Sequence, residues 1–105
     1  MQIPVAPLSL LQDRAELIVR RYGVSRIGLF GSCARGTPGP TSDVDVLVEF
    51  ADPFVTFDRY MDLKIFLEDL FARRVDLVIR HTLKPRIRNA VEEETVFVEI
   101  PAPLL

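Results

Sequence analysis

The chain has 105 residues, the size of one small domain, and its 13 basic and 15 acidic residues give a net charge of −2. A dedicated DNA- or RNA-binding protein needs a clear excess of positive charge, so this balance argues against direct nucleic-acid binding. No apolar run approaches the roughly 18 residues of a membrane span, and the first residues lack the pattern of a signal peptide. A single cysteine, Cys33, excludes an internal disulfide framework and a multi-cysteine zinc site. We therefore expect a cytoplasmic protein without a membrane partner.

The composition is that of a folded domain that is apolar for its length. Hydrophobic residues make up 49% of the chain and charged residues 27%, which is unlike a disordered segment. A chain this short buries only a modest fraction of its surface. We therefore expect part of the apolar surface to face another subunit, in a homo-oligomer or a hetero-oligomer.

The first third of the chain predicts one helix and one strand. Residues 1–8 contain two prolines, which indicates an extended lead-in. Ser9 and Gln12 have the spacing of a capping box, and apolar residues at helical spacing then continue to Gly23. Residues 27–30 are a short apolar run that ends in a glycine, which predicts a strand.

The middle of the chain predicts a long turn followed by a strand, a helix and a second strand. Residues 31–42 are rich in glycine and proline, and a helical turn is expected to start near their beginning. Apolar and polar residues alternate over 43–50 and again over 74–80, which is typical of strands. Between them, apolar residues at helical spacing predict a helix over 57–72, with Thr56 as its N-cap.

The end of the chain predicts a helix and a last strand. Thr82 is the expected cap of a short basic helix over 83–93, and residues 95–100 predict a strand before a tail at 101–105. Taken together, the elements predict a single α/β domain over residues 1–105. Its core is expected to be a small mixed sheet of about four strands flanked by helices.

Three acidic residues on two of these strands are candidates for chemistry. Asp43 and Asp45 are two residues apart, so both side chains lie on the same face of their strand. We expect that strand to be buried, where two neighbouring carboxylates need a neutralising cation. Asp76 lies in a similar apolar strand and reaches the same place if the two strands are neighbours. Three converging carboxylates hold two Mg²⁺ ions well, which suits phosphoryl or nucleotidyl transfer.

The turn before these acids is a candidate phosphate-binding site. Gly31 has no side chain, so the backbone can approach a ligand closely. The amides of this turn and the hydroxyl of Ser32 can donate hydrogen bonds to phosphate oxygens. Arg35 can add a charge-assisted contact. These three residues are therefore the expected nucleotide-binding residues.

The spacing of these residues, Gly31-Ser32-x10-Asp43-x-Asp45, resembles the signature of the DNA polymerase beta-like nucleotidyltransferase superfamily. Within it, the chain is most similar to the minimal nucleotidyltransferase (MNT) family, over about residues 15–100. The resemblance implies a nucleotidyltransferase palm-like fold. It implies that Gly31 and Ser32 bind the nucleotide phosphates. It also implies that the three acids bind Mg²⁺ and carry catalysis, with Asp76 nearest the attacking hydroxyl.

The resemblance also implies a partner. Members of this family commonly occur with a small helical HEPN protein, as toxin–antitoxin modules of bacteria and archaea. The chain is then expected to be a type VII-like antitoxin, an Mg²⁺-dependent protein adenylyltransferase with ATP as its substrate. It would transfer AMP to a tyrosine of a HEPN ribonuclease toxin.

Two other functions stay open. The chain is alternatively a non-catalytic antitoxin that neutralises its toxin by binding alone. It is alternatively the catalytic subunit of a nucleotidyltransferase whose small-molecule or RNA acceptor is bound by a separate chain. Little of the sequence remains beyond the catalytic sheet to select an acceptor, which favours an acceptor that brings its own surface.

Overall fold

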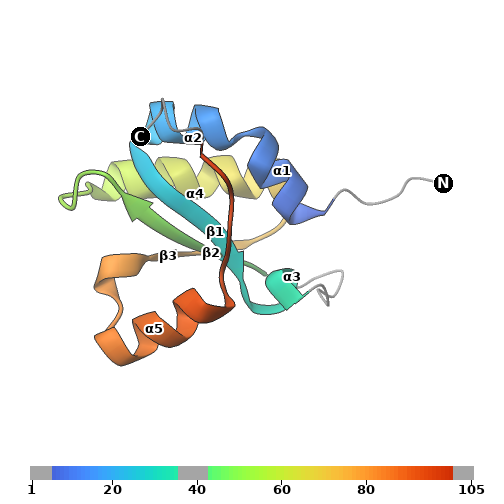
Figure 1. Cartoon of the computed structure of the whole chain (residues 1–105). Coiled ribbons are helices and arrows are strands. Elements are labelled where there is room, and N and C mark those ends of the chain that lie inside the picture. The colour runs from blue at the N-terminus through green and yellow to red at the C-terminus, as the bar shows by residue number, and fades with distance from the viewer. Residues whose placement is uncertain (1–5, 36–42, 101–105) are drawn as a thin grey trace.

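The fold is a four-stranded mixed sheet with helices on both sides, seen in a computed structural model that describes residues 6–35 and 43–100 (Figure 1). In chain order the elements are α1 (Pro7–Asp13), α2 (Ala15–Tyr22), β1 (Val24–Phe30), α3 (Gly31–Arg35), β2 (Val44–Phe50), α4 (Phe57–Phe71), β3 (Val75–Ile79), the 3-10 helix η1 (Arg80–Thr82), α5 (Pro85–Glu94) and β4 (Val96–Phe97). The predicted α/β class and mixed sheet are confirmed.

The strands lie in the order β3-β2-β1-β4. β1 pairs antiparallel with both β2 and β4, whereas β2 and β3 are parallel. A parallel pair needs a crossover connection, and α4 provides it. This topology places the beginnings of β2 and β3 at the same end of the sheet, where the end of β1 also lies.

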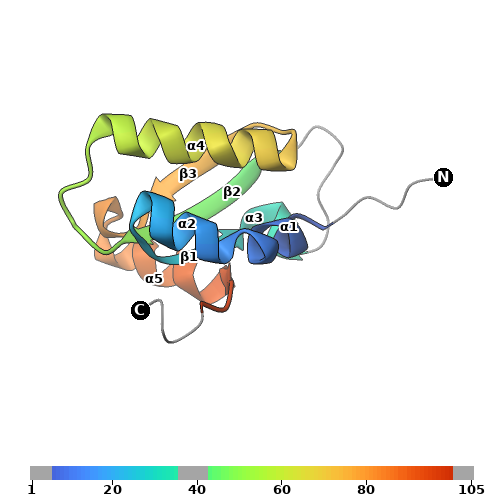
Figure 2. The same ribbon diagram turned by 90° about the horizontal axis from the view of Figure 1, so that it is seen from above.

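The helices divide between the two faces of the sheet, with α1, α2 and α4 on one side and α5 on the other (Figures 1 and 2). Alternate residues of β2 turn their side chains to the core, and Val44, Val46 and Val48 are fully buried there. They pack with Leu11, Ile18, Leu63 and Leu67 of the helices. None of the helices within the described ranges is both long and apolar enough to cross a membrane.

The predicted cap of α4 is confirmed. The Thr56 hydroxyl accepts a hydrogen bond from the amide of Arg59 at 3.2 Å, which satisfies one of the unpaired donors of the first turn. The helix ends at Ala72, whose left-handed backbone (φ 53°) closes the last turn. The chain then enters β3, which carries Asp76.

The start of the fold differs from the sequence prediction. α1 begins at Pro7, so the lead-in predicted over 1–8 is wrong for its last two residues, and residues 1–5 lie outside the described part. Proline fits a first helical turn, where no amide donor is needed. Ser9 therefore lies inside the helix and caps nothing. The single helix predicted up to Gly23 is divided at Arg14, which turns the chain between α1 and α2.

The end of the fold also differs. Lys84 is the N-cap residue of α5, and Thr82 instead donates its hydroxyl hydrogen bond to the carbonyl of Ile79 at 2.7 Å within η1. The last strand is limited to Val96–Phe97, because only two residues pair with β1 in register. The predicted tail at 101–105 lies outside the described residues.

Replacing Leu63 by alanine is expected to lower the free energy of unfolding by about 2–5 kcal/mol, because its side chain is fully buried between α4 and the sheet. Urea denaturation followed by circular dichroism measures this loss. Ile65 is the control on the same helix, since it is 51% exposed, and its replacement should change stability by less than about 0.5 kcal/mol. Equal losses in the two variants would contradict the packing described here.

Candidate active site

The parallel pairing of β2 and β3 brings two of the candidate acids together. Asp45 and Asp76 are direct partners in the register. The flanking positions Val44, Val46 and Val75 face the helices and are buried, so the acids point to the opposite face of the sheet. Asp43 precedes β2 by one residue. The register thus confirms that the strand carrying Asp76 lies beside the strand carrying Asp45, and the catalytic role of these residues remains a prediction.

The expected burial of these acids is wrong. Asp43 and Asp76 are exposed and Asp45 is half-buried, although the apolar residues beside them in β2 and β3 are buried. Solvation lowers the cost of like charges, so burial alone does not require a cation here. Among the residues that the structure describes, no three acidic, histidine or cysteine side chains already converge as a metal site.

Gly31 brings the predicted phosphate-binding turn against Asp45. β1 and β2 pair so that Phe30 lies opposite Asp45, and the chain turns into α3 at the next residue. Gly31 has a left-handed φ of +69°, and an added Cβ would lie 2.2 Å from Oδ2 of Asp45. Only glycine fits at this position. The structure therefore joins the Gly31-Ser32 turn and the acidic strand into one site.

Glu94 is a residue of this site that the sequence analysis missed. Its carboxylate accepts a hydrogen bond from the amide of Gly31 at 2.8 Å, which ties the end of α5 to the start of α3. The sequence contained a signal for such a contact. Three acidic residues lie in the last turn of α5, where the partial negative charge of the helix C-terminus disfavours them: Glu92, Glu93 and Glu94. Acidic residues at a helix C-terminus indicate that their carboxylates bind donors in other elements of the fold.

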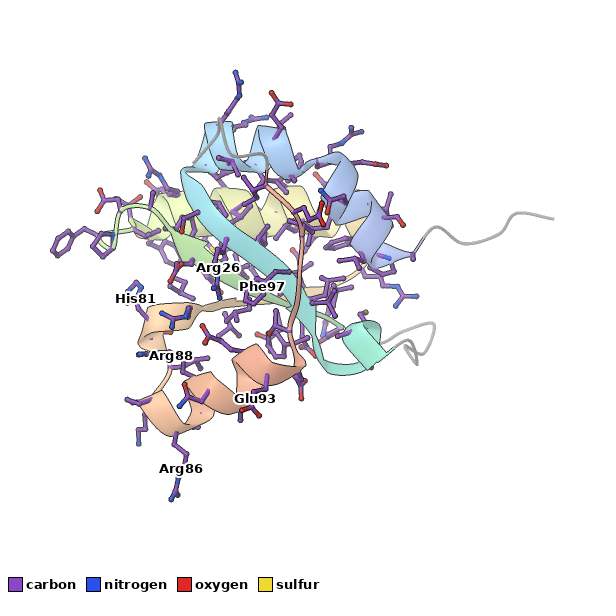
Figure 3. The ribbon with its side chains drawn as sticks, viewed as in Figure 1. Arg26, His81, Arg86, Arg88, Glu93 and Phe97 are labelled. Carbon is purple, nitrogen blue, oxygen red and sulfur yellow. The ribbon has the colours of Figure 1, made fainter. Side chains whose placement is uncertain are left out.

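Glu92 has such partners on the covered part of the same sheet face. Its carboxylate pairs with Arg80 and, at 3.3 Å, with Arg26, while Arg80 also reaches Glu49 at 3.2 Å. Arg26 lies over the ring of Phe97 with its guanidinium carbon 4.0 Å from the ring centroid (Figure 3). These contacts hold α5 and β4 against β1. Arg86, in contrast, points away from the sheet (Figure 3).

The ion pairs of Glu92 are expected to make stability depend on pH. The hydrogen bond from Arg80 lowers the pKa of Glu92 below its ordinary value of 4.5. A carboxyl whose pKa is depressed by folding stabilises the protein above its unfolded pKa, and this stability is lost as the pH falls through the folded value. Glu92→Gln should therefore destabilise the protein at pH 7, with the loss shrinking below pH 4.5.

Denaturant titrations at neutral and acidic pH test this dependence. Glu93→Gln is the matched control, because Glu93 is an exposed neighbour on the same helix. A pH-independent loss in Glu92→Gln, or an equal loss in Glu93→Gln, would contradict the assignment.

The remaining predicted residues lie in α3. Ser32 and Cys33 are half-buried, and Cys33 packs against the core as a small apolar residue. Burial raises the pKa of the Cys33 thiol, the positive charge of Arg73 opposes that rise, and Asp45 adds to it. Arg35 ends α3, and its side chain lies outside the described residues.

A large hollow in the described part of the chain lies away from the candidate acids. It has a volume of about 650 Å³ and lies between α2 and α4, and the described residues that line it include Arg21, Arg59 and Asp62. None of the candidate acids lines it.

The sequence and the fold both match known proteins. The family model described as "Nucleotidyltransferase domain" matches residues 13–98. The protein adenylyltransferase MntA of Thermococcus cleftensis is 39% identical over 90 residues, which cover 86% of this chain and 90% of the relative. A protein of Methanocaldococcus jannaschii named as an adenylyltransferase, MJ0128, is 34% identical over 85% of this chain and 91% of its own.

Solved structures share the fold. A structure described as a minimal nucleotidyltransferase matches with a TM-score of 0.71 and 39% identity, over 85% of this chain and 93% of its own. An MNT antitoxin in complex with a tri-AMPylated HEPN toxin of Shewanella oneidensis matches with a TM-score of 0.64, over 91% of this chain and 75% of that one. Its identity of 19% supports a common fold and no more.

Proposed function

Because the chain belongs to the nucleotidyltransferase domain family, we propose that it is a protein adenylyltransferase that transfers AMP from ATP to a tyrosine of a HEPN-type toxin, and so acts as an antitoxin. The relative named MntA, at 39% identity over most of both chains, supports the reaction type. The fold shared with an antitoxin bound to an AMPylated HEPN toxin agrees with this partner.

The observation that carries the proposal is the contact between the glycine turn and the acidic strand. Gly31 lies so close to Asp45 that a methyl group would not fit between them, and Asp76 is the partner of Asp45 in the sheet. The amides and hydroxyl at Gly31 and Ser32, with Arg35, would bind the triphosphate. Phosphate-binding groups and acids beside one another are what nucleotidyl transfer needs.

The donor set fits magnesium, since hard divalent cations prefer carboxylate oxygens. Asp43, Asp45 and Asp76 would hold two ions. Gly31 packs closely against the carboxylate of Asp45, so this carboxylate cannot turn toward Gly31. The contact therefore limits the directions in which its oxygens can face. When bound, the ions would neutralise the triphosphate and polarise the α-phosphate.

In this proposal the acceptor hydroxyl lies beside Asp76. The oxygen of a tyrosine hydroxyl attacks the α-phosphorus, so an oxygen–phosphorus bond forms on the acceptor. The bond between the α-phosphorus and the oxygen that bridges to the β-phosphate breaks, and pyrophosphate leaves. The hydroxyl proton passes to a carboxylate oxygen of Asp76. The exposure of Asp43 and Asp76 agrees with a protein acceptor, which supplies its own binding face.

The test is to incubate the chain with ATP, Mg²⁺ and the HEPN protein encoded beside it, and to measure the intact mass of that protein. We expect its mass to rise by whole AMP units, and the modified residue to be a tyrosine in peptide mass spectra. Omitting Mg²⁺ should abolish the increase.

Other outcomes separate the alternatives. A partner that binds tightly without a change in mass would favour an antitoxin that acts by binding alone. Label from ATP that appears in RNA or a small molecule, with none in protein, would favour a catalytic subunit with a different acceptor. Either result would overturn the proposed reaction.

A further inference from the structure

The side chain of Arg73 carries a buried donor atom, Nη1, that has no hydrogen-bond partner among residues 6–35 and 43–100. An arginine side chain stays charged and offers only donors. Leaving such a donor buried and unpaired is costly, so it needs an explanation, and a bound ligand that supplies an acceptor is one.

The backbone around Arg73 is held in place. The amide of Arg73 donates to the carbonyl of Glu68 at 3.3 Å, and the amide of Val44 donates to the carbonyl of Arg74 at 2.9 Å. The second bond joins the entry of β3 to the start of β2. Arg73 is therefore fixed three residues before Asp76, at the end of the sheet where Asp43 lies.

The charge of Arg73 acts on the phosphate-binding turn. It opposes the rise that burial causes in the pKa of the Cys33 thiol, and Asp45 acts on the same thiol. Cys33 directly follows Ser32 in α3. The hydrogen bond from Val44 to Arg74 places Arg73 beside the start of β2. The same end of β2 carries Asp45, against which Gly31 packs.

The charge around this site explains what Arg73 would bind. Asp43, Asp45, Asp76 and Glu94 all carry negative charge near Gly31, which would repel a triphosphate. A guanidinium group matches the geometry of phosphate oxygens and is weakly hydrated, so it suits a partly buried anion site. We propose that Arg73 is a nucleotide-binding residue whose side chain donates to a phosphate oxygen of ATP. This inference rests on the proposed function, since it requires that the site binds a nucleoside triphosphate.

The test compares ATP binding in Arg73→Gln and Arg74→Gln by isothermal titration calorimetry with Mg²⁺ present. Both changes remove one positive charge, and Arg74 is the exposed neighbour, so the pair separates position from net charge. We expect Arg73→Gln to raise the Kd for ATP roughly 10- to 100-fold, the range for a lost hydrogen bond to a charged group. Arg74→Gln should change it less than about threefold.

Thermal unfolding without nucleotide distinguishes ligand binding from a structural role. Because Nη1 has no hydrogen-bond partner in the described part of the unliganded protein, Arg73→Gln should keep or raise the melting temperature while it reduces the stabilisation that ATP adds. A lower melting temperature with unchanged ATP affinity would assign Arg73 a structural role and overturn the inference. Wild-type protein that binds no ATP would overturn the proposed function itself, whereas equal ATP affinity in wild type and Arg73→Gln would overturn this inference alone.

Discussion

Replacement of Asp45 by asparagine is expected to reduce AMP transfer at least about 100-fold without unfolding the protein. The amide keeps the size of the side chain but loses the charge that would hold a divalent cation beside Asp76, its partner in the register. Asp45 is half-buried, so the loss of stability should stay below about 1 kcal/mol. The rate of AMP incorporation into the partner measures the first effect, and urea denaturation measures the second.

Asp69→Asn is the matched control for this variant. Asp69 is an exposed acid on α4 that lines the hollow between α2 and α4, so the same chemical change is made away from the candidate site. Transfer should be unchanged in that variant. Wild-type transfer rates in Asp45→Asn would show that the acidic strand does not carry the reaction.

Replacement of Gly31 by alanine is expected to lower both stability and transfer. The new methyl group would lie 2.2 Å from Oδ2 and 3.1 Å from Cγ of Asp45, so the carboxylate has to turn away. The left-handed backbone at φ +69° adds strain of about 1–2 kcal/mol for a residue with a Cβ. We expect that loss in the free energy of unfolding and a loss of transfer at least about 10-fold, since misplacing one group by an ångström is already costly.

Gly23→Ala is the control for the backbone strain that a side chain causes at positive φ. It also has φ +69°, but a Cβ there would meet only the end of the Arg59 side chain at 3.3 Å. Gly23→Ala should therefore lose similar stability and keep its rate of transfer under conditions where it is folded. If both variants lose the same stability and both retain transfer, the contact between Gly31 and Asp45 has no role in the reaction.

Local patterns in the sequence were sufficient for most of the secondary structure. Alternation over β2 and β3 and the threonine cap of α4 are local properties, and all three elements form within a residue or two of their predicted bounds. The predicted bounds were less accurate for elements whose ends depend on their packing against other elements. The division of the first helix at Arg14 was not predicted. β4 is short because, of the described residues after α5, only Val96 and Phe97 pair with β1 in register.

The sequence by itself was enough to single out the candidate residues of the site. The spacing from Gly31-Ser32 to Asp43 and Asp45, and the single acid in the later strand, can be read without a structure, because they depend on strand periodicity and on residue type. The burial expected for these acids was wrong, because the exposure of a side chain depends on what packs over its strand and not on its neighbours in sequence.

Only the tertiary structure decided which residues meet. The parallel pairing of β2 with β3 places Asp76 beside Asp45, and the antiparallel pairing of β1 with β2 presses Gly31 against the same carboxylate. Glu94 reaches Gly31 because α5 packs across the sheet, and Arg73 lies beside the start of β2 because a crossover helix returns the chain to that end. Such contacts join residues far apart in sequence. They are set by the topology and packing of the whole domain, and no local pattern encodes them.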